Sequence, residues 1–189
     1  MEIKKELTAS GVKLNIVLIP YIVVCYLLLA LPYYWWWGVA INDVNLSRAA
    51  LVAILVACIF VHEAMHGFTW MWAGKLQWSD IKYGFIWKAL MPFAHSKKPL
   101  SKKVYQLGAV MPGIVLGILP YVIGLVCGQN DLAFVGLIMT LAASGDAWIL
   151  WMIRKESSNA LILDHPSKPG CYVVVPASDS ISIASSSAA

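Results

Sequence analysis

The chain has 189 residues and a formal net charge of +4, and it is 60% hydrophobic but only 13% charged. This apolar share and the mean hydropathy of +0.72 exclude an ordinary soluble domain and predict an integral membrane protein. A helix that crosses a bilayer takes about 20 residues. The length therefore predicts one membrane-embedded domain, residues 1–175, and the Ser- and Ala-rich residues 176–189 are expected to form a disordered tail.

Hydropathy predicts four membrane-spanning helices, each with few or no charges. They lie at about residues 14–31, 49–72, 104–127 and 132–153. The first follows basic residues, as a signal peptide does, but it is long enough to span and lacks a small-residue cleavage site. We therefore expect it to be retained. The four cysteines are scattered singly along the chain, so no structural disulfide is expected.

Basic residues are distributed unevenly among the predicted loops. Three lysines precede the first span, seven lie between the second and third, and three basic residues follow the fourth, whereas Arg48 lies on the other side. The positive-inside rule therefore predicts a multi-pass protein of the cell membrane with both termini in the cytoplasm. The net charge therefore reflects this topology. The lipid bilayer is the expected partner. Because the lysines accompany no base-reading helix or stacking platform, no nucleic-acid partner is expected.

Two segments between and after the spans predict strands. Residues 80–95, DIKYGFIWKALMPFAH, read as one or two short strands, and such a hairpin would have to pack on helices or line a wet cavity. The segment NALILDHPSKPGCYVVVP predicts a second strand pair with a turn at HPSKPG. The expected fold is therefore an α-helical integral membrane protein with about four transmembrane helices, a hairpin-like segment between the second and third helices and a small cytoplasmic β element after the fourth.

The second predicted span contains HEAMH, with His62, Glu63 and His66. On a helix the two histidines lie one turn apart on one face, where their imidazoles can bind one Zn²⁺. Glu63 lies about 100° around the helix, where it can act as general base on a metal-bound water. Placing an ionisable group at the centre of a span costs about 2.5–3.5 kcal/mol. The position of this motif therefore predicts a functional metal site.

A catalytic zinc site takes three protein ligands and leaves one position for water. Counted from the outer ends of their spans, His62 and Asp146 lie at about the same depth, roughly 20 Å. Asp146 is therefore the predicted third ligand. His95 and His165 are alternatives, although both belong to basic cytoplasmic segments. Cys58, one turn before His62, is either small filler or an additional ligand.

Three sequence features together resemble a known group. HEAMH in one helix, the later SGD and the segment LDHPSKPGCYV are similar to those of bacterial putative zincin peptidases, a group that resembles the site-2 family of intramembrane zinc metalloproteases. The resemblance covers about residues 50–175. It implies that His62 and His66 bind zinc, that Glu63 is the general base and that Asp146 is the third ligand.

The resemblance is incomplete at the third ligand. Site-2 proteases carry an Asn/Pro-containing stretch that leads to Asp-Gly, whereas this chain has SGD at residues 144–146, and its Pro112 lies on the preceding helix. No oxyanion-stabilising residue is therefore assigned. In that family a strand or hairpin presents extended substrate. The similar residues here are Tyr83, Gly84, Phe85 and Ile86.

Taken together, the sequence predicts a zinc-dependent, membrane-embedded endopeptidase that hydrolyses peptide bonds of membrane or membrane-adjacent proteins. One alternative is a non-catalytic membrane binding or regulatory protein with a structural or remnant zinc site. Another is that the two histidines are hydrogen-bonded core residues without a metal. A metal transporter would need ligands along a path through the membrane, and the outer halves of the predicted spans offer none.

Overall fold

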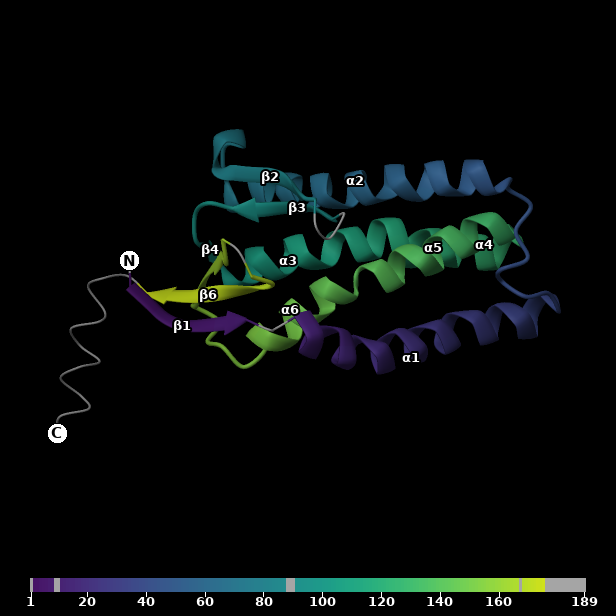
Figure 1. Ribbon diagram of the computed structural model, residues 1–189, viewed down its shortest axis with the longest axis horizontal. Helices are drawn as coiled ribbons and strands as arrows, with labels where there is room; N and C mark the ends of the chain where they lie inside the picture. The colour runs from purple at the N-terminus through teal and green to yellow at the C-terminus, as the bar shows by residue number, and fades with distance from the viewer. Residues whose placement is uncertain (1, 9–10, 88–90, 167, 176–189) are drawn as a thin grey trace.

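The computed structural model describes residues 2–8, 11–87, 91–166 and 168–175, and it shows helices running side by side with a small sheet at one end (Figure 1). The α-helices are α1 (Gly11–Trp37), α2 (Arg48–Gly74), α3 (Lys102–Pro112), α4 (Leu119–Cys127), α5 (Asn130–Ala142) and α6 (Ser144–Ile153). A π-helical stretch, Gly113–Ile118, joins α3 to α4, and a 3-10 turn, Trp78–Asp80, precedes the first hairpin. All four cysteines are free thiols.

Within the described residues, three helical segments are long and apolar enough to cross a membrane. They are Ile16–Trp37, Arg48–Gly74 and Lys102–Cys127. A fourth candidate consists of α5 and α6, which meet at a 40° bend around Ala143. The mostly helical architecture with three to four apolar spans was predicted from the sequence. Two details differ: α1 continues through the aromatic run to Trp37, and the fourth segment is bent rather than straight.

Local hydrogen bonds explain where α2 begins and ends. The side chain of Ser47 accepts the N–H of Ala50 at 3.2 Å and so caps the first turn. At the other end Lys75 adopts a left-handed conformation, with φ of 52°, and its N–H donates to the carbonyl of Met71. These caps set the limits of the helix that carries the HEAMH motif.

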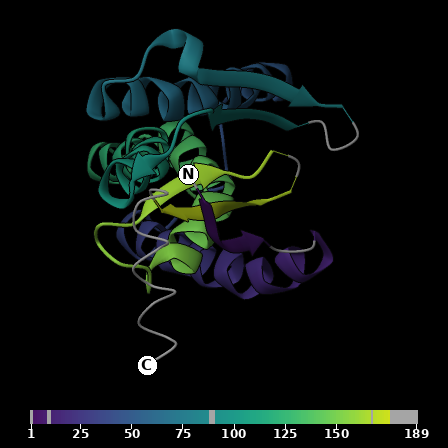
Figure 2. The same cartoon turned by 90° about the vertical axis from the view of Figure 1, so that its left-hand side faces the viewer.

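The strands form two separate antiparallel sheets. They are β1 (Glu2–Thr8), β2 (Ile81–Ile86), β3 (Met91–Ser96), β4 (Leu100–Ser101), β5 (Leu161–Asp164) and β6 (Gly170–Val175). A hairpin joins β2 to β3, and the four-stranded sheet has the order β1-β6-β5-β4. Figure 2 shows this larger sheet between the layer of α2 and the hairpin on one side and α1 on the other.

Both predicted strand pairs, β2–β3 and β5–β6, are present, but β1 was not predicted from the sequence. Its residues, EIKKELT, are mostly charged and mostly exposed, so the segment carries little strand pattern of its own. Its pairing with β6, from Glu2 opposite Val175 to Thr8 opposite Gly170, supplies the hydrogen bonds that make it a strand. The predicted tail, residues 176–189, lies outside the described residues.

An apolar cluster fixes the sheet end of the bundle. Trp70 of α2, Tyr105 of α3 and Ile153 of α6 are all buried there. Strand residues complete the cluster: Ile81, Ala94, Leu100, Ile162, Cys171 and Val173. Because this core joins α2, α3 and α6 to both sheets, it holds the ends of these helices in place. His62, Glu63 and His66 lie on α2 and Asp146 lies on α6, so the same core also positions these four residues.

Glycines allow α4 and α5 to pack closely at the opposite end. A Cβ at Gly136 would overlap the backbone of Gly117 and Tyr121. We expect Gly136→Ala to lower the free energy of unfolding by about 1–3 kcal/mol, because backbone atoms cannot move aside cheaply. Denaturation of the purified protein measures this loss. Gly145→Ala is the control, since no atom lies within 4 Å of its Cβ position; equal losses in both variants would contradict the packing argument.

Candidate metal centre

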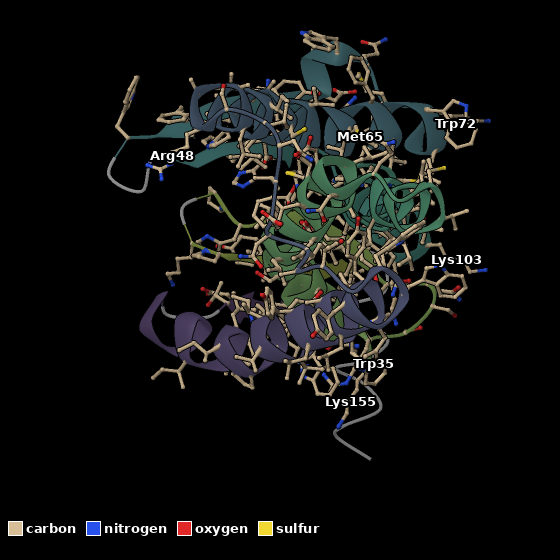
Figure 3. The ribbon with its side chains drawn as sticks, turned by 90° about the vertical axis from the view of Figure 1, so that its right-hand side faces the viewer. Trp35, Arg48, Met65, Trp72, Lys103 and Lys155 are labelled. Carbon is tan, nitrogen blue, oxygen red and sulfur yellow. The ribbon has the colours of Figure 1, made fainter. Side chains whose placement is uncertain are left out.

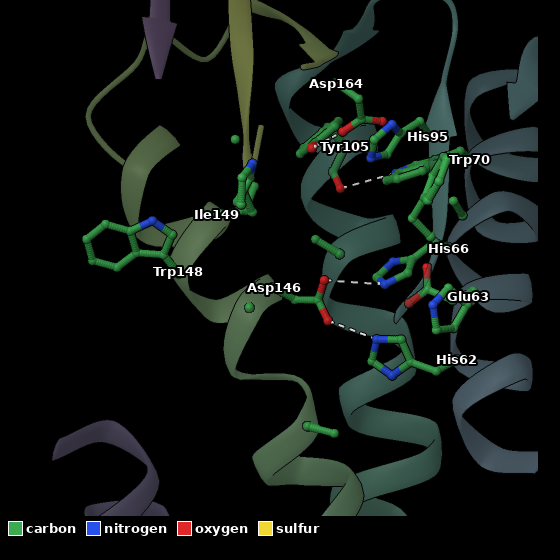
Figure 4. A pocket seen from close by; sticks show the side chains of 18 of the residues that line it. His62, Glu63, His66, Trp70, His95, Tyr105, Asp146, Trp148, Ile149 and Asp164 are labelled. Carbon is green, nitrogen blue, oxygen red and sulfur yellow. Dashed lines mark hydrogen bonds and ion pairs between the residues drawn. The ribbon is translucent and has the colours of Figure 1, made fainter. Parts of the chain in front are cut away.

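α2 and α6 bring four polar side chains together in the interior. His62, Glu63 and His66 lie on the second half of α2, and Asp146 lies in the first turn of α6, directly after the bend. The Nε2 atom of His62 is 3.1 Å from Oδ2 of Asp146, and the Nε2 atom of His66 is 3.3 Å from Oδ1 (Figure 4). Both histidines are buried. The structure therefore places all four predicted residues in one cluster, while their roles remain predictions.

The ring of His66 is held by a backbone carbonyl of α3. Its Nδ1 lies 2.9 Å from the oxygen of Gly108, and because a carbonyl only accepts, Nδ1 must carry the proton. In the neutral ring Nε2 is then unprotonated, and its lone pair faces the carboxylate of Asp146. Two electron-rich atoms at this distance need a cation between them, either a second proton or a metal ion. Such an outer hydrogen bond is typical of histidines that bind metal.

The spacing of the cluster fits zinc. Two ligands at about 2.0–2.1 Å from a tetrahedral zinc ion are separated from each other by about 3.3–3.4 Å. The two His–Asp distances, 3.1 and 3.3 Å, are close to this value, and each runs to a different oxygen of the Asp146 carboxylate. One ligand atom from each of His62, Glu63 and His66 also lies within 4.8 Å of the others. Two imidazole nitrogens and a carboxylate are a ligand set that zinc accepts at catalytic sites.

One buried atom of the cluster is not satisfied by the protein. Nδ1 of His62 has no hydrogen-bond partner among the residues that the structure describes. Burying an unpaired polar atom costs about 1–3 kcal/mol. A neutral His62 that binds metal through Nε2 would present an N–H at this position, to which a water molecule could bind.

A cavity of about 260 Å³ connects the cluster to the sheet end. Its walls come from α2, β3, α3, α5, α6 and the turn between β5 and β6. The lining residues are His62, Glu63, His66, Trp70, Pro92, Phe93, Ala94, His95, Tyr105, Ala109, Ala142, Gly145, Asp146, Trp148, Ile149, Asp164, Lys168, Pro169 and Gly170. The histidine and aspartate cluster therefore opens into a space that can hold a ligand.

The hairpin meets this cavity through β3 rather than β2. Tyr83, Gly84, Phe85 and Ile86 lie on β2 and pair with β3. Among the described side chains, Tyr83 and Phe85 are not part of the cavity wall. Tyr83 instead donates its OH to the carbonyl of Ala64 at 3.4 Å and so fixes the hairpin on α2.

The alternative ligands His95 and His165 lie at the sheet end. Figure 4 shows His95 beside Asp164, farther along the cavity than Asp146. Burial lowers the pKa of His95, and burial raises the pKa of the Asp164 carboxyl against the opposing effect of the nearby His95. His165 is buried, with Nε2 3.4 Å from Oε1 of Glu6. Cys58 is half-buried on α2.

Sequence reasoning missed the surroundings of the cluster. Gly108 and Tyr105 were not singled out, because a glycine and an aromatic residue in an apolar helix give no specific signal. Asp164 was visible as a carboxylate beside a predicted turn, but its contacts depend on the arrangement of α3 and β3.

Comparison with known proteins identifies a matching family model. A family model described as putative zincin peptidase matches residues 55–161, more than half of the chain. No curated protein and no solved structure matches significantly. The matched residues include the HEAMH motif, the β2–β3 hairpin and Asp146, and they leave out α1, β1 and β6.

Proposed function

The chain belongs to the putative zincin peptidase family, and we propose that it is a zinc-dependent endopeptidase embedded in a membrane. The observation that carries this proposal is the Asp146 carboxylate, which lies within 3.1 and 3.3 Å of the Nε2 atoms of His62 and His66. Glu63 lies beside the same point. We assign His62, His66 and Asp146 as zinc ligands and Glu63 as the general base.

The surface of the helices supports the membrane setting. Trp72 projects from α2 away from the other helices (Figure 3), and its side chain is 79% exposed. Many other large apolar side chains of α1 and α2 are exposed as well. Such surfaces suit lipid and not water. Most basic residues belong to the sheet and its adjoining segments, whereas Arg48 starts α2 at the other end, so we propose that the sheet faces the cytoplasm.

The proposed reaction is hydrolysis of a peptide bond by water. Zinc held by His62, His66 and Asp146 would supply Lewis acidity, which would polarise the scissile carbonyl and make the attacking water more acidic. The Glu63 carboxylate removes a proton from the attacking water while the new C–O bond forms. It then gives that proton to the amide nitrogen as the C–N bond breaks. Two products result, a new carboxyl end and a new amine end.

The outer edge of β3 offers a way to hold the substrate. Ser96 donates its N–H to Oδ2 of Asp164 at 2.7 Å instead of to β2. Because alternate residues of a strand point their backbone groups the same way, Ala94 also turns its N–H and C=O away from β2. Pro92 fits on this edge because it needs no ladder partner there. We propose that a locally unwound substrate segment pairs with this edge in extended form.

Metal removal tests the proposed activity. Protein purified in detergent should cleave an unfolded peptide substrate, lose this activity after treatment with a chelator and regain it when about one equivalent of Zn²⁺ is added, because the proposed reaction needs one metal ion. Zinc content is measured on the same samples. Cleavage that survives complete zinc removal would contradict the proposal. Bound zinc without cleavage of membrane or soluble peptides would instead support a regulatory protein with a structural zinc site.

A further inference from the structure

A row of stacked rings leads from the metal centre toward the sheet. The imidazole of His66 stacks on the indole of Trp70, with 5.6 Å between ring centroids and 24° between planes. Trp70 in turn stacks on Tyr105, at 5.4 Å and 21°. The indole N–H of Trp70 also donates to the carbonyl of Tyr105 at 3.3 Å. The orientation of His66 is therefore connected to that of Tyr105 on another helix (Figure 4).

Asp164 fixes the far end of this row. Its Oδ1 accepts the hydroxyl of Tyr105 at 2.5 Å, and its Oδ2 accepts the backbone N–H of Ser96 at 2.7 Å. One carboxylate at the end of β5 thus joins α3, which supports His66, to β3, which lines the cavity.

A glycine on α3, Gly108, leaves room for this row of rings. A Cβ at Gly108 would overlap the indole of Trp70, so a glycine at this position lets the ring lie against the helix. The carbonyl of the same residue accepts the Nδ1 proton of His66. Any shift of α3 along its axis would therefore disturb His66 in two ways, through its hydrogen bond and through its stacking partner.

Burying the carboxyl group of Asp164 lowers the free energy of unfolding unless its hydrogen bonds compensate. No lysine or arginine forms an ion pair with Asp164 within the part of the chain that the structure describes. Burial raises the pKa of the Asp164 carboxyl, and a buried polar group of this kind is usually less stabilising than a well-packed apolar side chain of similar size. Asparagine would place its NH₂ group opposite one of the two donors, because Tyr105 and Ser96 bond to different oxygens of the carboxylate. These facts favour a role for Asp164 in positioning the residues to which it is bonded.

We propose that Asp164 is a positioning residue, which orients His66 through Tyr105 and Trp70 and sets the position of β3 through Ser96. This inference rests on the proposed function. It adds that Asp164 keeps the proposed metal ligands and the substrate-binding strand β3 at a fixed distance from each other. If β3 holds the substrate, one carboxylate aligns both reaction partners.

Zinc affinity measured without any activity assay is the first test. We expect Tyr105→Phe, which removes only the hydroxyl, and Asp164→Asn each to weaken zinc binding about three- to tenfold, less than is typical of a direct partner of a metal ligand. Competition with a chromophoric chelator gives the dissociation constant. Tyr121→Phe is the matched control, because that buried hydroxyl also donates one hydrogen bond, to Leu29 at 2.7 Å, far from the site.

Two further readouts separate positioning from plain stabilisation. In the Co²⁺-substituted protein the absorption bands should shift in Tyr105→Phe but not in Tyr121→Phe. Asp164→Asn should in addition raise KM, since it disturbs Ser96 on β3. Unchanged zinc affinity and spectra in Tyr105→Phe, with a loss of stability equal to that of the control, would overturn the proposal. Absence of cleavage in the wild type would refute the proposed function and leave the zinc measurements to decide this inference.

Discussion

Glu63→Gln is expected to reduce peptide cleavage by about 10²- to 10⁴-fold while the zinc content stays that of the wild type. Glutamine has nearly the same size and fills the same space beside His62 and His66, but its amide cannot accept the proton of the attacking water. The measurement is the initial rate at saturating substrate, together with zinc determined by atomic absorption. An effect on rate without an effect on metal is the signature of a general base.

The matched control is a carboxylate outside the cavity. Glu156→Gln removes an ion pair with Lys5, 2.7 Å long, at the sheet surface, which is worth at most about 1 kcal/mol. It should leave the rate nearly unchanged. A Glu63→Gln variant that still cleaves at the wild-type rate would remove Glu63 from the mechanism, and one that loses zinc would indicate that Glu63 is a ligand.

Asp146→Ala should weaken zinc binding by more than about 100-fold, because a direct ligand contributes more than the 10- to 100-fold that outer-shell partners typically contribute. The purified variant should then contain far less than one zinc per chain. His62→Ala should behave in the same way, since both residues meet at the same point, 3.1 Å apart. Metal analysis of both variants and isothermal titration with Zn²⁺ measure these losses.

Asp131→Asn is the control for the aspartate. The Asp131 carboxylate accepts backbone N–H groups of Asn45 and Leu46 in a different part of the bundle and should not affect zinc. Loss of zinc in His62→Ala with full zinc in Asp146→Ala would point to another third ligand, with His95 next in line. Full zinc in both variants would show that the histidines are core residues and not ligands.

The sequence was sufficient for the features that depend on local pattern. Long apolar runs predict where the helices lie, although α1 is longer than its apolar run, and turn residues such as those of HPSKPG predict the β5–β6 pair. The relation between His62 and Asp146 was also accessible, because a fixed rise per residue converts sequence position into depth along a helix. The 40° bend at Ala143 was not predicted, although Ser144 and Gly145 follow directly and such Ser/Gly pairs often accompany helix kinks.

Other features depend on tertiary contacts that a single sequence does not display. β1 is mostly charged and becomes a strand only because β6 offers a partner edge. Asp164, Tyr105 and Trp70 are distant in the chain, and their types are common in helices and turns. β3 lines the cavity whereas the described side chains of β2 do not, and the bond from the Ser96 N–H to Asp164 is a contact that the alternation of residues alone does not reveal.

The order β1-β6-β5-β4 has a consequence for how the protein is made. β1 pairs with β6, Glu2 opposite Val175, and all the helices that the structure describes are synthesised between these two strands. β1 must therefore wait, unpaired, until translation has passed β6, and the sheet closes late. Contacts so far apart in the chain form slowly. A ribosome-stalled chain that ends before Gly170 should thus have helices but an open sheet, with β1 exposed to proteases.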